Sequence, residues 1–123
     1  MLIEHIHCIR GDNLNCNHKV LEAEAIICGG NETPSVYGKV KFYQKSCCVL
    51  VVANIQNLPK NDTGFYGFHI HEGNSCKGED FSNSRSHYNP HSTPHPDHAG
   101  DLPPLMLCGD KAHCRSIPAG SLA

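Results

Sequence analysis

A long, turn-rich segment, residues 73–100, interrupts a chain that otherwise resembles a series of short β-strands. It is dense in Gly, Ser, Asn, Pro and His and shows no helical period. A segment of this length without regular structure, inside a compact domain, is usually functional or disordered. Its composition favours a function, because most of the chain's ten histidines lie between residues 69 and 113. The fold must therefore support a long, chemically active loop.

The segments around this loop carry β patterns. In residues 36–43 the apolar Val36 and Val40 alternate with lysines, as on a strand with one buried face. Residues 48–55 are rich in β-branched side chains and are typical of a buried strand. Short turns between such segments favour antiparallel pairing, so we predict an all-β fold. The expected strands are 21–28, 36–43, 48–55, 65–72 and 102–107.

Length and charge exclude several classes of protein. A chain of 123 residues suits one domain, and a net charge of −2 provides no basic field for nucleic acid. No apolar run approaches the length of about 20 residues that a membrane helix needs. The N-terminal MLIEHIHCIRGDN has charges at Glu4 and Arg10 and does not resemble a signal peptide. We therefore expect a cytoplasmic protein, or a periplasmic or secreted one if a leader has been removed.

Two histidines in the expected strand 65–72 are spaced for metal binding. His69 and His71 are two residues apart, so in a strand both imidazoles leave the same face and can converge on one ion. The alternative is that they are two polar residues on the wet face of a half-buried strand. The pair alone favours this second interpretation.

The loop that follows strengthens the metal interpretation. His87, His95, His98 and Asp101 supply three imidazoles and one carboxylate, a set that suits a closed, tetrahedral zinc site. Prolines within the loop restrict its backbone and help to preorganise such a site. A flexible, histidine-rich loop without metal is the competing hypothesis. The absence of any CxxC pair among the eight cysteines argues against a zinc ribbon or a thioredoxin-type site.

His87 has two ring nitrogens and can serve two ions. One nitrogen can face the zinc, and the other can face an ion held by His69 and His71. A bridging imidazolate must lose both ring protons, which two divalent cations make feasible. Imidazole-only ligands suit copper, so the pattern predicts a copper and zinc pair.

Three segments in this order resemble the copper/zinc superoxide dismutase family, especially its bacterial members. They are GFHIHEG (Gly67–Gly73), SHYNP (Ser86–Pro90) and HAGDLP (His98–Pro103). The upstream GKVKFYQ (Gly38–Gln44) is similar to an early strand of that family. The resemblance covers about residues 21–107.

The resemblance implies an eight-stranded, antiparallel Greek-key β-barrel with the metals outside it. It implies that copper disproportionates superoxide to dioxygen and hydrogen peroxide, with zinc supporting the loop. It also implies that Cys76 matches a loop cysteine which the family joins by a disulfide to the barrel near its C-terminus. The implied copper ligands are His69, His71 and His87, and the implied zinc ligands are His87, His95, His98 and Asp101.

Beyond about residue 105 the resemblance ends, before the family's fourth copper histidine, its anion-steering arginine and the second disulfide cysteine. We expect an irregular arm at 1–20, the dismutase-like domain at 21–107 and a non-matching tail at 108–123, with the last strands of the barrel missing. Neither His113 nor Arg115 in the tail receives a family role, and His91 is expected to be exposed. An uncovered apolar face would favour self-association, such as a homodimer. The alternatives to an active dismutase are a metal-binding module without turnover and a truncated gene product.

Overall fold

The computed structural model describes residues 7–9, 22–44 and 49–116. Seven strands and one short 3₁₀ helix make up the regular structure of these ranges. The expected arm lies outside the described residues except for β1. The elements are β1 (His7–Ile9), β2 (Glu22–Cys28), β3 (Tyr37–Gln44), β4 (Val49–Gln56), β5 (Phe65–His69), η1 (Glu79–Ser84), β6 (Asp101–Met106) and β7 (Ala112–Ser116).

Five strands form one antiparallel sheet in the order β1-β2-β3-β4-β7. The alternation expected around β3 is confirmed, since Val36 and Val40 are buried while Tyr37 is 51% exposed. The middle of β4 is buried at consecutive positions from Val51 to Ala53, as its β-branched composition predicts. The sheet therefore turns one face toward the core and leaves the lysine-bearing face of β3 in solvent.

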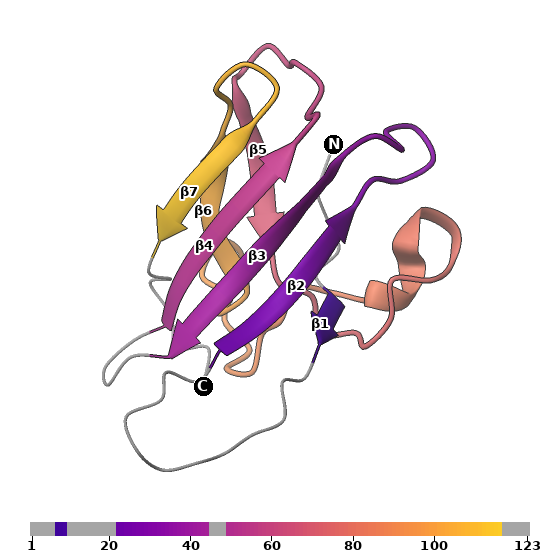
Figure 1. Ribbon diagram of the computed structural model, residues 1–123. Coiled ribbons are helices and arrows are strands. Elements are labelled where there is room, and N and C mark those ends of the chain that lie inside the picture. The colour runs from indigo at the N-terminus through magenta and orange to yellow at the C-terminus, as the bar shows by residue number, and fades with distance from the viewer. Residues whose placement is uncertain (1–6, 10–21, 45–48, 117–123) are drawn as a thin grey trace.

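The strands β5 and β6 pair with each other in a second antiparallel sheet, which lies behind β4 and β7 in Figure 1. Phe68 and Leu105 from this pair are fully buried and belong to the same core cluster as Val40 and Ile55 of the larger sheet. The two sheets thus enclose one apolar core, and the fold is all-β as predicted. Within the described residues they form two sheets facing each other rather than a closed barrel.

Two elements were not anticipated. Residues Ala112–Ser116, expected to lie in a non-matching tail, form β7 and pair with β4 from Ala112 against Ile55 to Ser116 against Val51. The long loop contains η1, whose Asp80 and Phe81 have positive φ angles of 46° and 63°. A helix as short and irregular as η1 leaves no periodic pattern in the sequence, so it could not be predicted. No helix in the described part of the chain is long and apolar enough to cross a membrane.

A register shift in the smaller sheet determines where the site begins. The pairing of β5 with β6 is irregular between Tyr66 and Phe68 and then resumes with His69 opposite Asp101. Such irregularities re-aim the side chains that follow them. The last residue of β5 and the first of β6 therefore face each other where the long loop leaves and returns.

We predict that the core under the site depends on Phe68, which is 1% exposed. Phe68→Ala should lower the free energy of unfolding by about 3–5 kcal/mol, because it removes a large buried ring and leaves a cavity. Phe65→Ala on the same strand is the matched control. Its ring is 49% exposed, and we expect a loss of about 1 kcal/mol or less. Urea denaturation of both variants tests this, and equal losses would contradict the assigned core.

Candidate metal centre

Three backbone hydrogen bonds fasten the long loop to the end of β5. The Ile70 N–H donates to Gly100 O (2.8 Å), the Tyr88 N–H donates to Ile70 O (2.7 Å), and the Gly100 N–H donates to Tyr88 O (2.8 Å). A β-carbon at Gly100 would lie 2.4 Å from the Ile70 carbonyl oxygen, so this approach requires glycine. Each of the three residues is next in sequence to a candidate ligand. The clamp therefore sets the positions of the site residues through the backbone.

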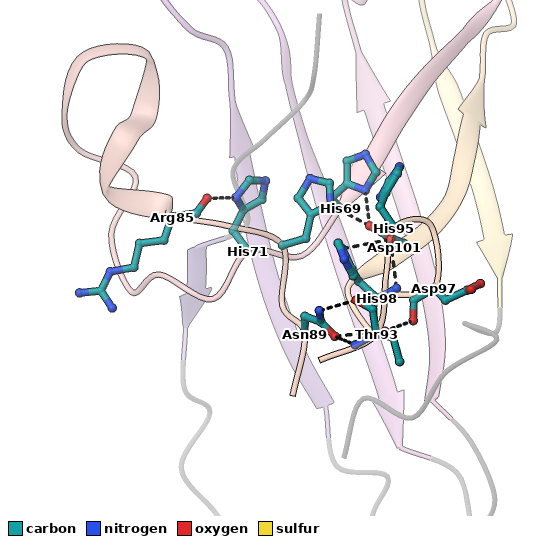
Figure 2. A network of polar contacts seen from close by, with 10 residues as sticks. His69, His71, Arg85, Asn89, Thr93, His95, Asp97, His98 and Asp101 are labelled. Atoms are coloured by element: carbon teal, nitrogen blue, oxygen red, sulfur yellow. Dashed lines mark hydrogen bonds and ion pairs between the residues drawn. The ribbon is translucent and has the colours of Figure 1, made fainter. Parts of the chain in front are cut away.

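The Asp101 carboxylate is the centre of the cluster. Its Oδ1 lies 2.8 Å from His87 Nδ1 and 3.1 Å from His69 Nδ1. Its Oδ2 lies 3.1 Å from His95 Nδ1 and 3.3 Å from His98 Nδ1. Four imidazoles from β5 and the loop thus converge on one carboxylate, as Figure 2 shows for the labelled members of the group.

The pKa of Asp101 is lowered although burial of the carboxyl alone would raise it. The backbone N–H of His98, the side-chain hydrogen bond from His87 and the charges of these two histidines outweigh the burial. Asp101 is therefore a carboxylate at neutral pH, the form that binds a metal.

Four residues lie close enough together to hold a single ion. Donor atoms of His87, His95, His98 and Asp101 all lie within 4.8 Å of one another. Metal–ligand bonds of about 2.0–2.1 Å place the donors of a tetrahedral zinc site about 3.3–3.4 Å apart. The contacts of Asp101 with these three imidazoles, 2.8–3.3 Å, are close to that spacing. The donor set and its spacing fit zinc.

The orientation of His98 supports this fit. Its Nδ1 is buried and makes no hydrogen bond, even though Asp101 Oδ2 is 3.3 Å away. A buried nitrogen without such a partner carries a cost in free energy. A cation between the imidazole and the carboxylate would remove that cost.

His69 and His71 both lie against the His87 ring, although the expected strand 65–72 ends at His69 and only the first of the two belongs to β5. The His69 ring stacks on His87 with centroids 4.0 Å apart, and the His71 ring meets it edge-on at 5.1 Å. Burial and the nearby His87 lower the pKa of His69, although Asp101 acts in the opposite direction. His69 is thus mainly neutral at neutral pH, which is the form that binds metal.

The loop holds His71 by its other ring nitrogen. His71 Nδ1 lies 2.7 Å from the Arg85 carbonyl oxygen, which can only accept, so Nδ1 carries the proton. The lone pair then resides on Nε2, the nitrogen left for a metal. The Arg85 side chain extends away from the histidines in Figure 2, so it does not replace the family's anion-steering arginine.

A side-chain network that the sequence analysis did not identify braces the loop. The Asn89 Nδ2 donates to Thr93 O (2.8 Å), the Thr93 N–H donates to Asn89 Oδ1 (3.0 Å), and the Thr93 hydroxyl donates to Asp97 O (2.7 Å). The Asn–Pro dipeptide at Asn89 was the available signal, since asparagine before proline favours a turn. In the sequence these three residues lie between His87 and His98. Their hydrogen bonds therefore restrain the loop segment that separates the two candidate ligands.

Two other histidines stay outside the centre. His91 is exposed, as expected. His113 on β7 contacts the Asn54 side chain on the neighbouring β4, in the larger sheet. The structure gives neither of them a place beside the metal cluster, in agreement with the sequence analysis.

A two-sheet β fold with three imidazoles and a carboxylate gathered at one end of its smaller sheet defines a protein with a candidate metal centre. Comparison with known families agrees, because the family model for copper/zinc superoxide dismutase matches residues 36–116. This chain belongs to the copper/zinc superoxide dismutase family. The match includes β7, beyond the end of the resemblance expected from the sequence.

A curated relative gives the same family. "Superoxide dismutase [Cu-Zn] 2" of Aquifex aeolicus (strain VF5) is 34% identical over 91 residues, which cover 69% of this chain and 52% of the relative. The chain thus spans about half the length of the relative that it matches.

We predict that Arg85 stores strain in the loop. Its φ of 62° and ψ of −151° fall in a region that is essentially reserved for glycine. Arg85→Gly should therefore raise the free energy of unfolding of the metal-free protein by about 1 kcal/mol. Arg85→Ala is the control, because it removes the same side chain but keeps a β-carbon. Urea denaturation compares the two, and an equal effect of both would refute the strain.

Proposed function

We propose that this protein disproportionates superoxide at a copper centre supported by zinc. The observation that carries the proposal is the cluster of four imidazoles around the Asp101 carboxylate, in a chain of this family. The donor chemistry supports zinc at the three-imidazole, one-carboxylate set and copper at the imidazole-only set. The zinc ligands would be His87, His95, His98 and Asp101, and the copper ligands would be His69, His71 and His87.

The chemistry that copper supplies when bound is a one-electron couple, which oxidises one superoxide to dioxygen and reduces a second to hydrogen peroxide with uptake of two protons. This chain's own residues would prepare that centre. The Arg85 carbonyl fixes the tautomer of His71, and Asp101 orients His87 through its Nδ1. These contacts fix the directions in which the two rings face. The Ile70–Gly100 backbone bond holds the strand end that carries His69 and His71.

A metal-binding module without turnover is the second candidate. It is favoured by the contact of His69 Nδ1 with Asp101 Oδ1, because this draws a candidate copper ligand toward the zinc set. In that case the centre would hold zinc firmly and would give no rapid redox cycle. The two candidates differ in copper chemistry and agree on zinc.

We predict about one zinc per chain at this site. His95→Ala should weaken zinc binding by more than about 100-fold, since even residues that only support metal ligands are worth 10–100-fold. His91→Ala is the matched control, because His91 is exposed in the same loop and outside the cluster. Competition with a chromogenic zinc chelator measures both variants. Undiminished affinity in His95→Ala would refute the assignment.

We predict that the protein supplied with copper and zinc accelerates superoxide decay and that His71→Ala loses this activity. Pulse radiolysis with a metal chelator present measures the decay without interference from free copper. The control is His113→Ala, whose imidazole contacts Asn54 away from the cluster. Decay no faster than in buffer, together with intact zinc binding, would leave the module without turnover as the function.

A further inference from the structure

The first half of the long loop folds against the end of β2. Gly30 lies two residues beyond that strand, and a β-carbon there would be 2.9 Å from Cε2 of the Phe81 ring. The Phe81 segment is itself compact, because the Gly73 N–H donates to Ser84 O (2.8 Å) and the Asn83 N–H donates to Lys77 O (3.0 Å). This segment carries the Arg85 carbonyl that holds His71. The loop and the larger sheet therefore meet at a defined place.

Two cysteines lie at this meeting point. Cys28 is the last residue of β2 and is exposed, whereas Cys76 is half-buried in the loop segment. Both are free thiols. The Asn83–Lys77 backbone hydrogen bond holds the neighbour of Cys76 in the segment whose Phe81 ring lies against Gly30, two residues beyond Cys28. Burial raises the pKa of Cys76, and the neighbouring Cys28 raises it further. No sequence spacing indicates this pair, since the residues are far apart in the chain.

We propose that Cys28 and Cys76 form a reversible disulfide that ties the metal-bearing loop to the five-stranded sheet. The proposed bond differs from the one that the family resemblance implies for Cys76, whose partner there lies near the C-terminus. It does not depend on copper turnover, so it stands or falls separately from the proposed function.

The reaction is thiol–disulfide exchange with a low-molecular-weight disulfide such as oxidised glutathione. The exposed Cys28 loses its proton and attacks one sulfur of the oxidant, which releases one thiolate and leaves a mixed disulfide. The Cys76 thiolate then attacks the Cys28 sulfur and releases the second thiolate. The oxidant gains two electrons and becomes two thiols, and the protein loses two hydrogen atoms. The exposed Cys28 suits the first step, because the oxidant can reach it, and the half-buried Cys76 then reacts within the molecule after losing its proton to solvent.

The disulfide would stabilise the folded protein by reducing the conformational freedom of the unfolded chain. The two cysteines enclose the whole of β3, β4 and β5, and a disulfide that closes a long loop restricts the unfolded state strongly. In the folded protein the Phe81 ring of the loop already lies against Gly30, just beyond β2, so the bond would add little new restraint to the native state. Oxidation would therefore mainly raise the free energy of unfolding of the protein. It would also keep the loop that supports His71 in its folded position.

The test uses the full chain at native pH, incubated with oxidised glutathione or with a reductant, then alkylated and digested with trypsin without reduction. The tryptic peptides 20–39 and 61–77 each contain one cysteine, so a disulfide between them identifies the Cys28–Cys76 bond without ambiguity. We expect this cross-linked peptide in the native sample and its loss in a sample oxidised in guanidinium chloride. A bond from Cys76 to another cysteine, or no enrichment over the unfolded sample, overturns the proposal.

Thermal unfolding supplies the second measurement. Oxidation should raise the Tm by about 5 °C or more, as expected for a disulfide in a small domain. Cys76→Ser should abolish this rise, whereas Cys108→Ser should retain it, because Cys108 is exposed on the β6–β7 connection. The absence of a rise in the cross-linked protein, or a rise that survives in Cys76→Ser, refutes the role of the bond as a tie.

Discussion

The arrangement of the whole site depends on one carboxylate. Asp101 begins β6 opposite His69 at the end of β5, so the pairing of the smaller sheet places its charge directly beneath the loop. Both of its oxygens are used, each toward two imidazoles. A charge in a partly buried position is stable only with partners of this kind. The loop histidines therefore have an electrostatic reason to gather at this strand end.

The scaffold and the loop contribute differently to the site. The strands β5 and β6 bring His69 and Asp101 together through backbone pairing, which does not depend on the surface side chains nearby. The loop reaches the same place through the clamp of Ile70, Tyr88 and Gly100, and it accepts unfavourable backbone angles at Arg85. Strain of this kind persists where surrounding contacts determine the conformation. The position of His71 depends on this strained loop, and that of His69 does not.

The sequence predicted the elements that carry a period and missed those that do not. Alternation around β3 and the β-branched run of β4 specify strands because burial on one or both faces selects such residues. The strand β7 was not predicted from the sequence, because its five residues carry no clear period and it forms by pairing with β4. The spacing of His87, His95, His98 and Asp101 indicated one cluster, and the structure brings these residues together. The contact of His69 with Asp101 was unpredictable, because it follows from the register shift near Phe68.

The two expected metal sets are linked through His87 and also through His69. His69 stacks on the His87 ring, and burial together with electrostatic repulsion from His87 lowers the pKa of His69. Asp101 offsets part of this repulsion and holds both Nδ1 atoms through the same oxygen. A cation bound among His87, His95 and His98 would engage Asp101 and weaken its attraction for His69. Filling the zinc set would then release the His69 imidazole toward His71, so zinc would prepare the copper set by changing the partner of a single side chain.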